Sequence, residues 1–236
     1  MGNLSGRRIL FIGDSLSVSN FGPRLEGNLA AQGAEVLRDA KGGRSVRWFY
    51  ANGGKLDAGR LPGLVKQIDP TDVVMALGTN DAGFGPADGL KWWTRFQGDI
   101  RKDASGPVRF YWVTPPEFDE RAGKVKTNVD AIREAFVPLF DGVVDSRPLT
   151  LDLLTPAQGR MKDYIHFARR SAGELWADRV TEKLLGVMSG TTQPPVRVET
   201  GDTPPPAASS GMGAKVALVG GAIFVAILLA RLTRRD

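Results

Sequence analysis

The stretch Phe11-Ile12-Gly13-Asp14-Ser15-Leu16-Ser17 decides how the rest of this chain is interpreted. It follows Arg8-Ile9-Leu10, so an apolar run of the kind that forms a buried strand stops at a glycine and gives way to small polar residues. Such residues can cap a helix, whose first N–H groups would then lie near the Ser15 hydroxyl. Ser15 is therefore either a helix cap after a first strand or a nucleophile at a strand end.

Beyond this stretch, short apolar runs alternate with amphipathic helix patterns. Residues 72–77 are nearly continuous in apolar side chains, as expected of a parallel strand buried on both faces. Alternating strands and helices predict an α/β domain with a parallel sheet and helices on both faces. The predicted strands lie within 8–12, 34–37, 72–77, 108–113 and 142–145, and the predicted helices within 20–32, 61–68, 90–104, 128–140 and 168–185.

Polar residues follow three of these predicted strands. Ser15 ends the first, the Gly42-Gly43 loop follows the second, and Asn80 lies in Gly78-Thr79-Asn80-Asp81 after the third. Ligands of open parallel sheets bind outside the carboxyl ends of the strands. We therefore expect these three sets of residues, distant in sequence, to meet at one edge of the sheet.

The single histidine offers a base for a serine nucleophile. His166 lies in Lys162-Asp163-Tyr164-Ile165-His166-Phe167, just before the last predicted helix. On a loop or open turn, Asp163 can reach one imidazole nitrogen while the other nitrogen faces Ser15. A histidine with a purely structural role is the alternative.

Two further groups could stabilise an oxyanion. Gly43 offers a backbone N–H that can approach a substrate closely, and Asn80 offers a side-chain amide. Taken alone, Asn80-Asp81 could equally be a simple turn, and Asp14 is interpreted as a capping residue rather than a proton carrier.

In the order and spacing of these motifs, the chain resembles the SGNH, or GDSL-type, hydrolases over residues 7–187. Gly13-Asp14-Ser15-Leu16-Ser17 resembles the first block of that family and Gly43 the glycine of its second block. Gly78-Thr79-Asn80-Asp81 resembles the third block and Asp163-Tyr164-Ile165-His166 the Asp-x-x-His block.

The resemblance implies a flavodoxin-like three-layer α/β/α sandwich with a five-stranded parallel sheet. It implies Ser15 as the nucleophile, His166 as the base and Asp163 as the partner of that base. It also implies an oxyanion hole formed by the N–H groups of Ser15 and Gly43 and by the amide of Asn80. The resemblance implies no metal and no cofactor.

Two local features refine this resemblance. The stretch Arg60-Leu61-Pro62-Gly63-Leu64-Val65-Lys66-Gln67 is similar to the bacterial thioesterase and lysophospholipase branch of the family. Many members have a proline directly after the histidine, whereas this chain has Phe167. The difference bears on the rigidity of the loop and on the placement of His166.

Composition limits the chemistry of the chain. The 236 residues contain no cysteine, which excludes disulfides, thiolate zinc sites and cysteine nucleophiles. Glu117, Asp119 and Glu120 lack a histidine partner, so no metal site is expected. The net charge of +5 comes from dispersed basic residues, so we expect no nucleic-acid partner. Anionic polysaccharide and membrane surfaces suit this charge equally well.

The domain organisation follows from a change of composition near the C-terminus. Residues 1–188 are expected to form the hydrolase-like domain, and residues 189–213, rich in Pro, Gly, Ser and Thr, a flexible linker. Residues 214–232 are predicted to form a single transmembrane helix, followed by a basic tail at 233–236.

The predicted membrane anchor leaves its orientation open. An uncharged apolar run lies between Lys215 and Arg231, and a helix packed on the domain or on a partner is the alternative. The positive-inside rule places the arginine end in the cytoplasm, whereas no secretory signal is visible before the first strand. The expected localisation is therefore a membrane, and the side on which the hydrolase-like domain lies stays open.

Three functions are compatible with these observations. The first is a membrane-anchored serine esterase that removes a short acyl group, such as acetyl, from a cell-envelope polysaccharide. The second is a lipolytic esterase or thioesterase, and the third is a non-catalytic binding or structural protein in a membrane-associated assembly, which could be a virion. Four aromatic residues could form a sugar or acyl platform or simply pack in the core: Trp48, Phe49, Trp92 and Trp93.

Overall fold

The computed structural model describes residues 4–50, 59–154 and 164–190. Five parallel strands form one sheet in the order β2-β1-β3-β4-β5, the flavodoxin-like arrangement that the resemblance implies. The elements are β1 (Arg8–Gly13), α1 (Ser15–Val18), α2 (Phe21–Ala31), β2 (Glu35–Ala40), η1 (Val46–Phe49), α3 (Arg60–Ile68), β3 (Asp72–Ala76), η2 (Asp81–Phe84), α4 (Pro86–Asp103), β4 (Arg109–Val113), η3 (Glu120–Ala122), α5 (Lys124–Phe136), η4 (Val137–Leu139), β5 (Gly142–Val144), α6 (Arg147–Thr150), η5 (Leu151–Leu154) and α7 (Arg170–Met188), where η marks a 3-10 helix.

The central strands are apolar throughout because both of their faces are buried. Successive side chains of a strand point to opposite faces. In β1, Leu10 and Ile12 belong to one hydrophobic core, whereas Ile9 and Phe11 belong to the other. The same alternation holds in β3 and β4, so the sheet separates two cores.

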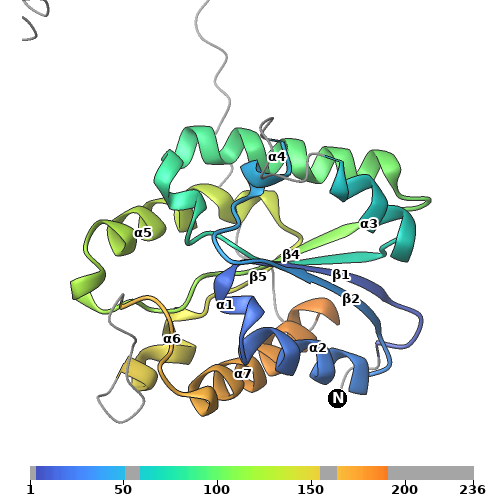
Figure 1. The fold of residues 1–236 in the computed structure, drawn as a ribbon. Helices are drawn as coiled ribbons and strands as arrows, with labels where there is room; N and C mark the ends of the chain where they lie inside the picture. Colours follow the sequence, from blue (N-terminus) through green and yellow to red (C-terminus); the bar gives the residue numbers. More distant parts are fainter. Residues whose placement is uncertain (1–3, 51–58, 155–163, 191–236) are drawn as a thin grey trace, which may run out of the picture. The chain divides into compact units, whose positions relative to one another are not determined.

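Helices cover both faces of this sheet. Helices α3, α4 and α5 lie on one face, and α1, α2 and α7 lie on the other (Figure 1). On the second face, α2 packs against α7, and the ring of Phe21 stacks on that of Trp176 with 3.7 Å between their centroids. The predicted three-layer α/β/α architecture is therefore confirmed for the described residues.

Two helices, α5 and α4, differ by four residues from their expected bounds. The helix predicted at 128–140 is α5, which begins at Lys124 and ends at Phe136. Pro138 then lies in the 3-10 turn η4, because a proline cannot donate the hydrogen bond that an α-helix requires. The helix predicted from residue 90 begins instead at Pro86, a residue suited to the first helical turn.

The membrane anchor predicted at 214–232, together with the linker and the basic tail, lies outside the described residues. Within the part of the chain that the structure describes, no helix combines the length and apolarity needed to cross a bilayer.

Candidate active site

Ser15 lies where β1 turns directly into α1. Gly13 is required in this turn, because a Cβ at residue 13 would lie 2.2 Å from the Cβ of Ser17. Asp14 caps the short helix, since its Oδ1 accepts the N–H of Leu16 at 2.9 Å. The turn thus holds Ser15, which is partly exposed, at the carboxyl edge of the sheet.

His166 meets Ser15 across 151 residues of sequence. Its Nε2 lies 2.7 Å from the Ser15 Oγ, which is hydrogen-bond distance for a nucleophile and its base. The histidine is in the segment that precedes α7, as the sequence indicates. The structure therefore brings together the two residues that an acyl-transfer reaction needs first.

Phe167 fixes the segment that carries His166. The Phe167 ring lies 5.9 Å from that of Trp176, centroid to centroid, and Trp176 is buried in the core between α2 and α7. Many SGNH hydrolases, the family that the chain resembles, have a proline at this position. In this chain, aromatic packing of Phe167 on Trp176 attaches the loop to the core instead. Asp163 lies outside the described residues, and its role as the partner of His166 stays a prediction.

The two loops that carry the predicted oxyanion donors, Gly43 and Asn80, are hydrogen-bonded to each other. The Nδ2 of Asn80 donates to the backbone carbonyl of Arg44 at 3.0 Å. Gly43 has a φ of +71°, a conformation that favours glycine, and a Cβ there would meet no atom within 4 Å. The glycine therefore serves the shape of the loop and leaves its backbone open on one side.

Arg44 anchors this loop from beneath. It is 1% exposed, and its guanidinium pairs with the Asp39 carboxylate at 3.0 Å and also donates to the Asp39 carbonyl. The guanidinium also lies over the rings of Trp48 and Phe49, at 4.7 and 5.0 Å from their centroids. Arg60 is a second cation on the same carboxylate, at 2.7 Å. These contacts fix the residue that follows Gly43.

The Asp39 carboxylate stays ionised in this setting. Burial raises its pKa, but the hydrogen bonds from Arg60 and the nearby charge of Arg44 outweigh burial and hold the pKa below its usual value. A buried arginine with a charged partner is consistent with the rule that buried charges are paired.

Asp81 fixes the loop after Asn80 in a similar way. Its Oδ1 accepts the backbone N–H of Val46 and the indole N–H of Trp93, both at 2.9 Å. Burial raises the pKa of Asp81 to about 6, against the lowering effect of these hydrogen bonds. Asp81 thereby connects η2, η1 and α4 behind the site.

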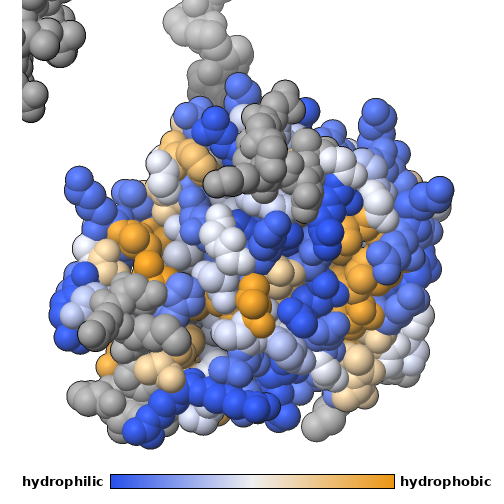
Figure 2. Space-filling view, viewed as in Figure 1, coloured by the Kyte–Doolittle hydropathy of each residue, from blue (hydrophilic) through white to orange (hydrophobic). Residues whose placement is uncertain are grey.

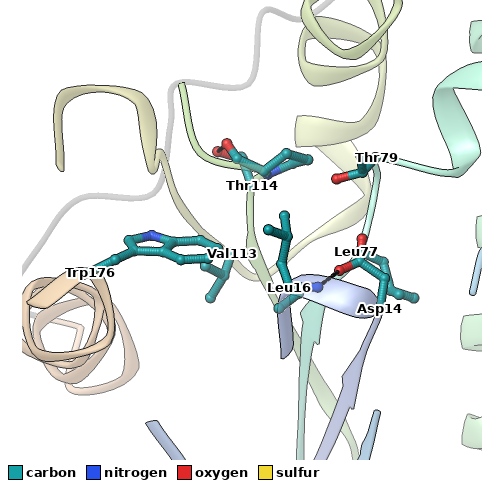
Figure 3. A pocket seen from close by; sticks show the side chains of 9 residues that line it. Asp14, Leu16, Leu77, Thr79, Val113, Thr114 and Trp176 are labelled. Carbon is teal, nitrogen blue, oxygen red and sulfur yellow. Dashed lines mark hydrogen bonds between the residues drawn. The ribbon is translucent and has the colours of Figure 1, made fainter. Parts of the chain in front are cut away.

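Asp14 borders a small cavity beside α1. The cavity has a volume of about 10 Å³, room for one water molecule at most, and Asp14, Leu16, Thr79, Thr114 and Trp176 are among its lining residues (Figure 3). Burial raises the pKa of Asp14 to about 7, and the Asp81 carboxylate adds a smaller rise. A carboxyl group next to the candidate nucleophile is therefore partly protonated at neutral pH.

We expect Asp14→Asn to stabilise the protein at pH 8. The folded pKa of about 7 exceeds the usual 3.8, so the folded state keeps a proton that the unfolded chain has released, and stability falls as the pH rises through this range. Asparagine keeps the helix cap without the charge. Urea unfolding should show a gain of roughly 4 kcal/mol at pH 8 that largely disappears near pH 4.

The exposed Asp88 supplies the control for this measurement, because Asp88→Asn changes the net charge equally. The unfolding free energy of Asp88→Asn should match that of the wild type at every pH. A pH dependence of Asp14→Asn that matches the wild type would contradict the prediction.

Three of the four aromatic residues considered as a binding platform pack in the core. Trp93 and Phe49 are at most 1% exposed and Trp48 is 8% exposed. Trp92 is partly exposed and stacks on Tyr50, with 5.4 Å between the ring centroids. Of the four, Trp92 alone therefore remains available on the surface.

Sequence reasoning missed the parts played by Arg44, Asp39 and Asp81. An arginine directly after the glycine loop was a signal, but its burial depends on Trp48 and Asp39, which only the fold brings to it. Among the described residues, no group of three or more histidine or acidic side chains could hold a metal ion.

No family model matches the chain, and no curated protein matches it. Solved structures do share its fold. A carbohydrate acetylesterase family member from Sinorhizobium meliloti superposes with a TM-score of 0.57 at 14% identity, over 77% of this chain and 99% of that one. A lipase/acylhydrolase from Enterococcus faecalis gives a TM-score of 0.51 at 19% identity, over 76% and 96%.

A third similar structure is the C-terminal catalytic domain of peptidoglycan O-acetyltransferase A from Streptococcus pneumoniae. Its TM-score is 0.51 at 18% identity, over 78% of this chain and 95% of that domain. The chain thus has the α/β fold of these esterase, lipase and acyltransferase structures. Identities this low establish the fold, whereas an activity has to be argued from the site.

Proposed function

We propose that this protein is a serine ester hydrolase that works through an acyl-enzyme. The observation that carries the proposal is the 2.7 Å contact between the His166 Nε2 and the Ser15 Oγ. In the proposed reaction His166 takes the proton of the Ser15 hydroxyl as its oxygen attacks the ester carbonyl. The protonated histidine then gives that proton to the leaving alcohol, and water releases the acyl group in a second, equivalent attack.

The proposed oxyanion hole consists of the backbone N–H groups of Ser15 and Gly43 and the Asn80 amide. Asn80 has two amide hydrogens, of which one bonds to the Arg44 carbonyl and orients the other. Donors held in place before the reaction stabilise the developing charge without reorganisation. Asp163 is proposed to hold the second ring nitrogen of His166.

The favoured substrate is an O-acetylated cell-envelope polysaccharide. The rim beside the candidate site carries aromatic and cationic side chains of η1 and α4 in contact with one another, which suits a sugar polymer better than an acyl chain. On the face seen in Figure 2, hydrophobic residues form separate patches between hydrophilic ones. The likeness to a carbohydrate acetylesterase family member supports the same choice.

A lipolytic esterase or thioesterase is the second candidate. The likeness to a lipase/acylhydrolase and the membrane anchor proposed at 214–232 favour it. The anchor itself is supported by its uncharged apolar run between Lys215 and Arg231. A non-catalytic protein of this fold would have no need for the contact between Ser15 and His166.

Reaction of the full-length protein with a fluorophosphonate probe tests the proposal. We expect labelling of the wild type and of Ser19→Ala, which removes a nearby exposed hydroxyl, but no labelling of Ser15→Ala. With 4-nitrophenyl esters, kcat/KM should be highest for acetate and should fall as the acyl chain lengthens. A rise with chain length would select the lipolytic candidate, and a folded wild type that neither labels nor hydrolyses any ester would exclude catalysis.

The full-length protein labelled with the fluorophosphonate probe also tests the membrane anchor proposed at 214–232. The full-length chain should float with lipid vesicles in a density gradient, and a chain that ends at residue 213 should not. Equal behaviour of the two proteins would remove the anchor from the proposal without affecting the proposed chemistry.

A further inference from the structure

Arg47 lies between the two loops of the proposed oxyanion hole. It is in η1, four residues after Gly43, and its guanidinium lies over the ring of Phe84 at 5.2 Å from the centroid. Phe84 ends η2, four residues after Asn80. The contact between Arg47 and Phe84 therefore joins the two loops at the rim of the candidate site.

Aromatic contacts restrict the position of this guanidinium. It also lies over the ring of Trp92, at 5.8 Å from the centroid. Trp92 in turn stacks on Tyr50, whose hydroxyl donates to the Asp99 carboxylate at 2.9 Å. Arg47 thus rests against a series of interacting side chains on η1, η2 and α4.

The charge of Arg47 is not neutralised by the described part of the chain. Arg44, Arg60 and Arg95 each pair with an aspartate carboxylate. Arg47 is exposed, and within residues 4–50, 59–154 and 164–190 no carboxylate lies at ion-pair distance from it. Its contacts there are with aromatic faces.

The aromatic contacts leave the N–H donors of the Arg47 guanidinium without a carboxylate acceptor in the described part of the chain. The Arg47 guanidinium carbon lies over the rings of Phe84 and Trp92, at 5.2 and 5.8 Å from their centroids, and the group carries five N–H donors in its plane. That fork matches a carboxylate, which it can bind through two parallel hydrogen bonds. Phe84 is 36% exposed, so part of an aromatic surface remains beside the fork for a sugar ring.

We propose that Arg47 binds a carboxylate of the substrate, and hence that the substrate is an acidic polysaccharide bearing uronic acid residues near the ester. The proposal rests on the ester hydrolase function proposed above. The bound uronate lies at the rim formed by η1 and η2, and the ester of a neighbouring position on the polymer reaches Ser15. Arg47 thereby determines specificity without taking part in the chemical step.

Acetate release from two polymers tests this assignment with the full-length protein. The substrates are an acetylated galacturonan and an acetylated neutral galactan of the same degree of acetylation, with 4-nitrophenyl acetate as a small neutral ester. We expect the wild type to favour the galacturonan about tenfold in kcat/KM at low salt, and Arg47→Gln to remove that preference. Both neutral substrates should stay within about twofold of the wild-type values, because they make no charged contact.

Arg95→Gln is the matched control, because Arg95 also lies over Trp92 but is already paired with Asp99 at 3.7 Å. It should keep the preference for the galacturonan. An equal loss on all three substrates in Arg47→Gln, or a preference that survives this substitution, would overturn the assignment. So would Arg47-dependent activity confined to phosphatidylglycerol vesicles, which would identify a lipid phosphate as the ligand.

The test separates this inference from the function on which it rests. Hydrolysis of 4-nitrophenyl acetate that requires Ser15, without any preference between the polymers, would overturn the role of Arg47 alone. A wild type inactive on all three substrates would overturn both.

Discussion

His166→Ala should lower kcat for 4-nitrophenyl acetate by about 10⁴-fold or more. The chain contains one histidine, and its Nε2 is 2.7 Å from the Ser15 Oγ, so no second imidazole can take the proton. Without a base, the serine attacks as a neutral hydroxyl, which is a poor nucleophile. Initial rates measured with excess substrate give the loss directly.

His166→Gln distinguishes proton transfer from positioning. Glutamine can still hydrogen-bond to Ser15 but cannot accept its proton at neutral pH. We expect it to be as inactive as His166→Ala, with circular dichroism and thermal unfolding like those of the wild type. Substantial turnover by His166→Gln would mean that the histidine only holds the serine in place.

Arg44→Met should cost about 3 to 5 kcal/mol of unfolding free energy, because it removes one partner of a buried ion pair. Asp39 would still pair with the more exposed Arg60, but the rings of Trp48 and Phe49 would lose their contact with a guanidinium. Urea unfolding measures the cost. The same substitution should lower kcat more than it raises KM, because Arg44 holds the loop that carries Gly43, a donor of the proposed oxyanion hole.

Arg60→Met provides the matched control for Arg44→Met. Both side chains pair with Asp39, but the Arg60 side chain is 45% exposed and the Arg44 side chain 1% exposed. Removal of the exposed partner should cost about 1 kcal/mol or less and leave kcat unchanged. Equal costs for the two substitutions would show that burial is not what makes Arg44 important.

The sheet could be predicted from the sequence because its central strands are buried on both faces. In β1 and β3 this produces apolar runs that end in glycine and polar residues, so the strands and their carboxyl ends are both visible. The meeting of Ser15, Gly43 and Asn80 at one edge then follows from the rule for parallel sheets. The helices on both faces follow from the alternation of strand and helix patterns, whereas the flavodoxin-like order of the five strands was an expectation from the family resemblance alone.

The supporting residues of the site could not be predicted in this way. The segment from Lys41 to Arg47 is largely polar, and nothing local distinguishes the buried Arg44 from the exposed Arg47. Their difference arises from Asp39, Trp48 and the aromatic residues of α4, which only the fold brings together. The observed end of α5 also differs from the expected one, because Pro138 stops the helix although the apolar pattern continues.

The separation of Ser15 and His166 has a consequence for how the protein is made. Ser15 follows the first strand, whereas His166 is held through Phe167 and Trp176 by the last helix of the domain. Synthesis proceeds from the N-terminus at about 5 to 20 residues per second, so the serine leaves the ribosome many seconds before its base. An unfinished or prematurely released chain therefore carries Ser15 without His166, and the proposed ester cleavage would begin only once the whole domain has been synthesised and folded.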